Sequence, residues 1–169
     1  RCRDRLAKRV RARFRFGRLL YFVYETAGRS APHRNSTETD MLDIQHLMSP
    51  QGPEPVGPFS HAVRAGDYIF VTGQMPTLPD DPTKPVEGGI EAQTIRVMEN
   101  LRLVLEGLDS SLDRTVFARV YLVNFQDFDA MNKVYESYFP ADRLPGRTCI
   151  GVTGLAVGAL VEIDLIVAA

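Results

Sequence analysis

The sequence predicts an α+β domain in which two amphipathic helices cover one face of a single sheet, in the order ββαβαββ. Segments rich in β-branched and aromatic residues alternate with two segments whose apolar residues recur every three or four positions. With 44% hydrophobic and 24% charged residues, the composition is that of a globular protein. A length of 169 residues allows one substantial core and leaves little room for a second domain.

A β-hairpin opens the domain. Residues 49–58 are rich in Pro and Gly and form its lead-in. We expect strands over 61–64 and 68–72, joined by a tight turn at Gly66-Asp67 and followed by a strand end over 73–76. The next segment, 77–89, is predicted to be a loop because of its breakers, Pro79, Pro82, Pro85, Gly88 and Gly89.

A helix is predicted from about Ile90 to Gly107. Gly107 stands where a helix C-terminal stop belongs. Apolar spacing gives one stripe, which we interpret as core, formed by Thr94, Val97, Met98, Leu101, Val104, Leu105 and Leu108.

The second half repeats this alternation. A β-branched and aromatic strand is expected over 115–123, and a helix over about 127–139. Breakers at 140–146 precede a strand over 147–153. One face of the second helix carries Phe128, Met131, Tyr135, Tyr138 and Phe139.

The final strand is expected over 159–168. It places Val161, Ile163 and Leu165 on one side and Glu162 and Asp164 on the other. Both helices can cover one sheet face, which leaves the opposite face to be buried by something else. In a chain this small we expect that cover to be a second copy, in a symmetric homo-oligomer.

Charge divides the chain near residue 41. Residues 1–40 carry 11 basic and 4 acidic side chains, whereas 41–169 carry 9 basic and 17 acidic, a net of −8. The chain begins with Arg, and Met41 precedes the patterned region. We therefore expect 1–40 to be a basic extension, disordered or not native, and 41–169 to form the domain. A transit peptide, or an arm that binds nucleic acid or an anionic membrane, remains an alternative.

Several function classes receive no support from motifs. No apolar run is long enough to span a bilayer. Cys2 and Cys149 suggest no disulfide framework, so a cytoplasmic location is the default, or an organellar one if 1–40 are a transit peptide. The histidines are scattered, without CxxC or HExxH, and no metal site is predicted.

Reactive side chains stand at four places. Arg147 opens a strand and could clamp a carboxylate or form a surface ion pair. Cys149 shares its face, and we expect its backbone to matter more than its sulfur. Glu162 and Asp164 are costly inside an apolar strand, so they face solvent or another subunit's Arg, or one orients a water. Asn132 lies mid-helix, either solvated or positioning a ligand.

Five sequence blocks, in this order, resemble the Rid family of YjgF-like proteins: GPFSHAV (57–63), VTGQMP (71–76), NKVYESYF (132–139), PGRTC (145–149) and LVEID (160–164). The resemblance covers about 57–169. It implies a chorismate-mutase-like (bacillus-type) fold, assembled as a homotrimer with clefts between subunits.

The resemblance also implies an activity. Members of the RidA branch hydrolyse 2-aminoacrylate and related 2-imino acids to 2-keto acids and ammonia without a cofactor. By this likeness Arg147 binds the carboxylate, Glu162 places the attacking water, and the backbone of Cys149 contacts the substrate. The remaining positions that correspond to family substrate-binding residues are Phe59, Thr72, Gly73 and Asn132. Phe59 stands where active deaminases often carry Tyr, which removes a hydroxyl and keeps the ring as a wall.

Imine chemistry suits these residues, because a 2-imino acid is already electrophilic at C2 and needs only a clamp, a water and exclusion of solvent. We therefore expect a cofactor-independent deaminase that binds a small 2-imino or 2-keto acid and neither nucleic acid nor membrane. The alternatives are a non-catalytic metabolite-binding trimer and a hydrolase of another small amide, carbamate or aminoacrylate. Nucleic-acid binding would rest on the basic residues 1–18 alone.

Overall fold

The computed structural model describes residues 14–16, 19–21 and 43–169. The chain separates by its contacts into Arg1–Asp40 and Met41–Ala169. In the first unit, β1 (Phe14–Phe16) pairs antiparallel with β2 (Leu19–Tyr21). The rest of the expected extension lies outside the described residues, and its dispensability stays a prediction.

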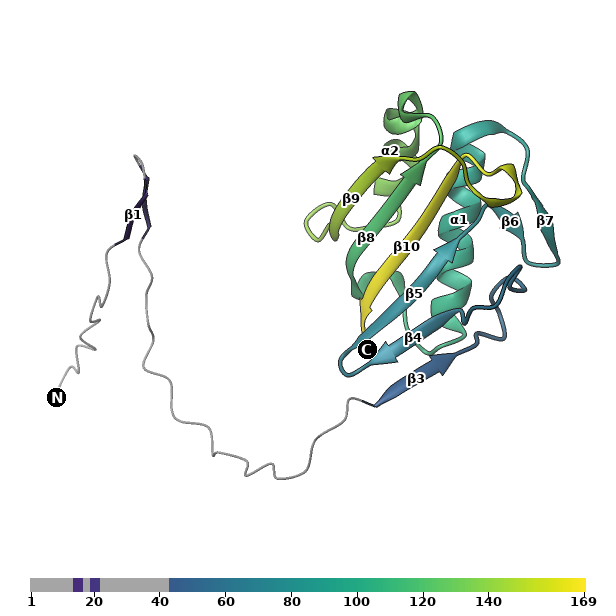
Figure 1. Cartoon of the computed structure of the whole chain (residues 1–169), viewed down its shortest axis with the longest axis horizontal. Helices are drawn as coiled ribbons and strands as arrows, with labels where there is room; N and C mark the ends of the chain where they lie inside the picture. The colour runs from purple at the N-terminus through teal and green to yellow at the C-terminus, as the bar shows by residue number, and fades with distance from the viewer. Residues whose placement is uncertain (1–13, 17–18, 22–42) are drawn as a thin grey trace. The chain divides into compact units, whose positions relative to one another are not determined.

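The second unit is built on one six-stranded sheet with the order β3-β4-β5-β10-β8-β9 (Figure 1). Neighbouring strands are antiparallel except β8 and β9, which are parallel. The strands are β3 (Ile44–Leu47), β4 (Ala62–Ala65), β5 (Tyr68–Gln74), β8 (Thr115–Leu122), β9 (Gly146–Gly151) and β10 (Val161–Ala168).

Two features of the strands differ from expectation. The sequence pattern predicts no strand over β3, because the residues of β3 are mostly exposed at the sheet edge and lack an alternating pattern. The predicted loop over 77–89 was wrong in part, because β6 (Thr77–Leu78) and β7 (Asp81–Pro85) form a small hairpin. Prolines are tolerated there because a two-stranded ribbon consists of edges, where a strand residue need not donate a hydrogen bond.

The helices are α1 (Gly89–Glu106) and α2 (Phe128–Glu136). Gly107 ends α1 and donates its N–H to the carbonyl of Leu103, 3.1 Å away. The second helix is shorter than predicted, because its first residues form a separate 3₁₀ turn. It also ends earlier than predicted, at Glu136.

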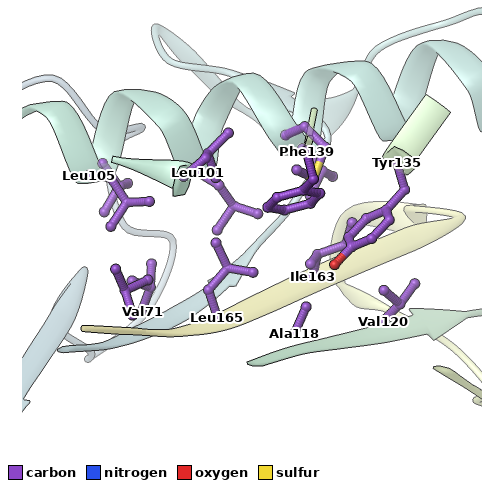
Figure 2. Packing of buried hydrophobic residues seen from close by; sticks show 14 of the residues in the cluster. Val71, Leu101, Leu105, Ala118, Val120, Tyr135, Phe139, Ile163 and Leu165 are labelled. Carbon is purple, nitrogen blue, oxygen red and sulfur yellow. The ribbon is translucent and has the colours of Figure 1, made fainter. Parts of the chain in front are cut away.

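Both helices cover the same sheet face, as predicted (Figure 1). Figure 2 shows the core between them and the sheet, with Leu101 and Leu105 of α1 above Val71 and Leu165. None of the helices in residues 43–169 is long and apolar enough to cross a membrane.

The opposite face of the sheet carries exposed apolar side chains. In β5, Tyr68 and Phe70 alternate with the buried Ile69 and Val71 and are 46% and 44% exposed. Ile150 of β9 lies on the same open face, next to Tyr121, and is 45% exposed. Such a face has the character of a surface buried by a partner.

Candidate functional site

Arg147 and Cys149 lie on the helix-covered face of the sheet. In the parallel pairing of β8 with β9, Arg147 is opposite Ala118 and Cys149 is opposite Val120. Ala118 and Val120 are fully buried under the helices. Because β9 is the edge strand, its inward side chains remain half-buried.

The guanidinium of Arg147 lies over two aromatic rings of α2. Its central carbon is 4.8 Å from the ring centre of Tyr135 and 5.7 Å from that of Phe128. Within residues 43–169 Arg147 takes part in none of the ion pairs. The rings hold a cation whose five N–H donors remain available to an anion.

The sequence pattern predicts only that Phe128 and Tyr135 lie on the core face of the helix. Helical periodicity places them on the buried face, but it cannot tell that an arginine from a distant strand stacks on them. In Figure 2 the hydroxyl of Tyr135 points towards the sheet. Burial raises the pKa of Tyr135 to about 12, against a lowering effect of Arg147, so the hydroxyl stays protonated at neutral pH.

Asn132 lies on the same side of α2, four residues after Phe128 and three before Tyr135. Its Oδ1 is buried, and so is the Tyr135 hydroxyl oxygen; neither has a hydrogen-bond partner among the described residues. Buried polar atoms are normally paired, so these two oxygens are exceptions to that rule.

Cys149 shares this neighbourhood but does not have an activated thiol. Burial raises the pKa of Cys149, which outweighs the opposing effect of Arg147. A thiol of raised pKa is a poor nucleophile at neutral pH. Among the described residues Cys149 therefore does not have the character of a catalytic nucleophile.

A second group of residues gathers around Glu162, on the open face of the sheet. Glu162 is opposite Tyr121 and lies between the fully buried Val161 and Ile163, whose side chains point to the helices. Its carboxylate lies against Gly73 of β5. Burial raises the pKa of Glu162, and the negative charge of Asp164 adds to that effect.

Both carboxylate oxygens of Asp164 accept hydrogen bonds from side chains of its own chain. Arg119 donates from Nε to its Oδ1 at 2.8 Å, and the Tyr121 hydroxyl donates to its Oδ2 at 2.9 Å. The sequence left open whether Asp164 faces solvent or another subunit's arginine, and within the described residues its carboxylate binds Arg119 and Tyr121. The partners belong to β8, whose register against β10 the sequence does not reveal.

Thr72 and Phe59 complete this second group. The Thr72 hydroxyl donates to the carbonyl of Ser60 at 2.7 Å, which fixes the loop that carries Phe59. The Phe59 ring is 41% exposed and lines a pocket together with Gly73.

The structure thus places the expected site residues in two groups on opposite faces of the sheet. Arg147, Cys149 and Asn132 form the clamp group, at the edge between β9 and α2. The water group comprises Glu162, on the open face, Gly73, which lies against its carboxylate, and Thr72 and Phe59 beside Gly73. A molecule of three or four carbons cannot contact both through a sheet, so one copy of the chain does not bring Arg147 and Glu162 together.

Comparisons with known proteins agree with the fold. A family model described as Endoribonuclease L-PSP matches residues 49–169. A RutC family protein of Saccharolobus solfataricus is 40% identical over 121 residues, which cover 71% of this chain and 94% of the relative. Protein MMF1, mitochondrial, of Saccharomyces cerevisiae is 30% identical over 145 residues, 86% of this chain and 96% of the relative.

Among solved structures, RidA from the Antarctic bacterium Psychrobacter sp. superposes with a TM-score of 0.68. It is 30% identical and the match covers 74% of this chain and 99% of that one.

Proposed function

This chain belongs to the Rid (YjgF-like, endoribonuclease L-PSP) family, and on that premise we propose that it hydrolyses 2-imino and 2-enamino acids to 2-keto acids and ammonia. The observation that carries the proposal is the Arg147 guanidinium, stacked on Tyr135 and Phe128 without an ion pair among the described residues. It offers a bidentate clamp for a small carboxylate.

In the proposed reaction, Arg147 holds the substrate carboxylate and Glu162 holds a water at C2. The water oxygen bonds to C2, its proton passes to the Glu162 carboxylate, and the electron pair of the C=N π bond moves to nitrogen. Glu162 then returns the proton to that nitrogen, which gives a carbinolamine. The carboxylate next takes the proton of the new C2 hydroxyl and passes it to the nitrogen, the C–N bond breaks, and ammonia leaves as the C2 carbonyl forms. A raised pKa suits a carboxylate that must both accept and return a proton near neutral pH.

Asn132 fits the same scheme. Its unpaired Oδ1 can accept a hydrogen bond from the imine N–H, next to the clamped carboxylate. Orientation of the imine between Arg147 and Asn132 fixes C2 for attack from the side of the water.

Because the clamp group and the water group lie on opposite faces of the sheet, we propose that each site takes Arg147 from one copy and Glu162 from another. The exposed apolar open face supports such an assembly. A homotrimer, as the family resemblance implies, gives three equivalent sites of this kind.

An endoribonuclease activity, suggested by the family description, is less well supported. Residues 41–169 carry 9 basic against 17 acidic side chains, whereas a protein that binds a polyanion normally presents a basic surface. Two alternatives would use the same clamp: a hydrolase of another small amide, and a trimer that binds keto acids without turnover. The assay below distinguishes them from an imine deaminase.

We propose a cytoplasmic protein, or an organellar one if residues 1–40 act as a transit peptide. The second alternative is supported by the basic composition of that segment and by a yeast relative named as mitochondrial.

The test follows imino acids generated in situ by an amino-acid oxidase, with the remainder trapped by semicarbazide. Wild type is expected to accelerate decay and Arg147→Ala to abolish the acceleration, while Arg143→Ala, an exposed arginine four residues earlier, retains it. Phe59→Tyr measures the effect of the missing hydroxyl. Full activity of Arg147→Ala would refute the clamp, and binding of keto acids without turnover would replace the enzyme with a binder.

A further inference from the structure

The beginning of β10, which carries Glu162, is paired on one side only. On the β8 side the ladder already includes Val161 and Glu162. On the β5 side the first paired residue is Ile163, opposite Gln74. The end of a strand that lacks a neighbour opens more easily than the middle of a sheet. The place of the Glu162 carboxylate therefore depends on what holds the chain just before the strand.

A buried glutamine of α1 holds this part of the chain. Gln93 is 5% exposed, and its Oε1 accepts the backbone N–H of Leu160, two residues before Glu162, at 2.8 Å. Its Nε2 donates to the carbonyl of Val86 at 3.2 Å, so both ends of the side-chain amide are engaged. Because α1 packs on the sheet through its buried face, Gln93 ties the chain just before β10 to the core.

A second buried amide of α1 holds the neighbouring strand. Asn100 lies two helical turns further along the same face of α1 and donates from Nδ2 to the carbonyls of Met75 and Thr77, at 2.9 and 2.8 Å. These carbonyls come just after Gly73. The same helix thus fixes the chain on both sides of the close contact between Glu162 and Gly73.

We propose that Gln93 is a positioning residue for Glu162, which acts by fixing the start of the strand that carries this carboxylate. The inference rests on the proposed function, in which Glu162 holds the attacking water. Among residues 43–169 the Glu162 carboxylate forms no ion pair, so its place follows from its backbone and from the space beside Gly73. Gln93 then affects kcat, whereas binding of the substrate carboxylate depends on Arg147.

The experiment removes the hydrogen bond between Gln93 and Leu160 from either partner. Gln93→Met removes the acceptor, and Leu160→Pro removes the N–H donor; Ala159 before it has ψ 148°, the extended backbone that a following proline requires. For the imine derived from 2-aminobutyrate, each variant is expected to lower kcat about ten- to a hundredfold and to change KM by less than about twofold, since a reacting group is displaced. Gln93→Glu keeps an oxygen that accepts the Leu160 N–H, and its kcat is expected to stay within about threefold of wild type.

Leu112→Ala is the control for a loss of stability alone. Leu112 is a buried core residue three positions before Thr115, which pairs with Val167 at the far end of β10. Truncation of a buried leucine should lower the melting temperature and leave kcat at the wild-type value. An equal loss of kcat in Leu112→Ala would overturn the inference, because lost stability would then explain the Gln93 variants.

Titration of the Glu162 carboxyl separates this inference from the proposed reaction. Carbon-13 NMR follows that carboxyl, whose signal is assigned by its absence in Glu162→Gln. Burial raises its pKa, so the displaced carboxyl is expected to titrate at lower pH in Gln93→Met and Leu160→Pro but not in Leu112→Ala. This shift supports the role of Gln93 even if no imine is turned over. A wild-type titration of Glu162 in both folded variants would overturn that role.

Discussion

Gly73 and Glu162 are packed so closely that the position of a β-carbon on Gly73 is occupied by the Glu162 carboxylate. Such a β-carbon would meet Oε1 and lie 2.9 Å from Cδ. The backbone of Gly73 has no positive φ, so the requirement for glycine here comes from space and not from conformation. The carboxylate of the proposed base thus has room in its present position only because residue 73 carries no side chain.

Gly73→Ala is therefore expected to move the carboxylate without unfolding the protein, because the colliding atoms are the end of a flexible side chain. Displacement of a reacting group by about an ångström lowers rates about 10²-fold. Imine decay and thermal melting measure both effects. Gly154→Ala is the matched control, since a β-carbon there meets nothing within 4 Å and the backbone has no positive φ. Unimpaired catalysis by Gly73→Ala would argue against the role of Glu162.

Glu162→Gln is expected to lower activity by about 10²-fold or more, as loss of a general base does, and to stabilise the fold at neutral pH. Burial raises the pKa of Glu162 in the folded chain. Protonation of Glu162 thus stabilises the folded state. This stabilisation is fully present below the unfolded-state pKa of Glu162 and is lost as pH rises through its folded-state pKa. The stability gain of Glu162→Gln over wild type should be larger at pH 8 than at pH 4.

Melting temperatures at the two pH values measure that gain. Glu136→Gln, an exposed substitution on α2, should show no comparable change between them. A gain that is equal at pH 4 and pH 8 would contradict the raised pKa of Glu162.

Asp164→Asn is expected to shift the acid limb of the pH–rate profile to lower pH. The negative charge of Asp164 makes ionisation of Glu162 harder, so its removal lowers the pKa of Glu162. Since the base must be unprotonated, activity then persists to lower pH. The profile of kcat/KM tests this, with the exposed Asp113→Asn as control. If the acid limb of the Asp164→Asn profile stays at the wild-type pH, a group other than Glu162 controls that limb.

Removal of residues 1–40 is expected to leave folding and turnover unchanged. Every buried residue of the hydrophobic core cluster belongs to the unit Met41–Ala169. A chain that begins at Met41 should melt within a few degrees of the full chain and show the same imine decay. Loss of either property would show that the basic extension is part of the working protein.

The periodicity of apolar residues predicts those helices and strands that have one buried face. The stripe from Val97 to Leu105 gave α1, and the alternation of Val161, Ile163 and Leu165 gave the buried side of β10. It missed β3, whose residues are exposed, and β7, whose prolines resemble those of a loop. Burial periodicity cannot detect a strand that has no buried face.

The sequence predicts a set of candidate site residues but not how they are arranged in space. Arg147 stacks on Tyr135 and Asp164 binds Arg119 through pairings of distant strands and helices, which no local pattern encodes. For the same reason the sequence could not show that Arg147 and Glu162 lie on opposite faces. That placement needs the register of β8 against both β9 and β10.

The most direct test of the account mixes two inactive variants, Arg147→Ala and Glu162→Gln, and lets their subunits exchange, with mixed oligomers verified by mass spectrometry. If each site takes its clamp from one copy and its base from another, random mixing in a ring restores about one quarter of the sites. Imine decay should then return to about a quarter of the wild-type rate. A mixture that exchanges subunits but stays as inactive as its components would contradict a site shared between copies.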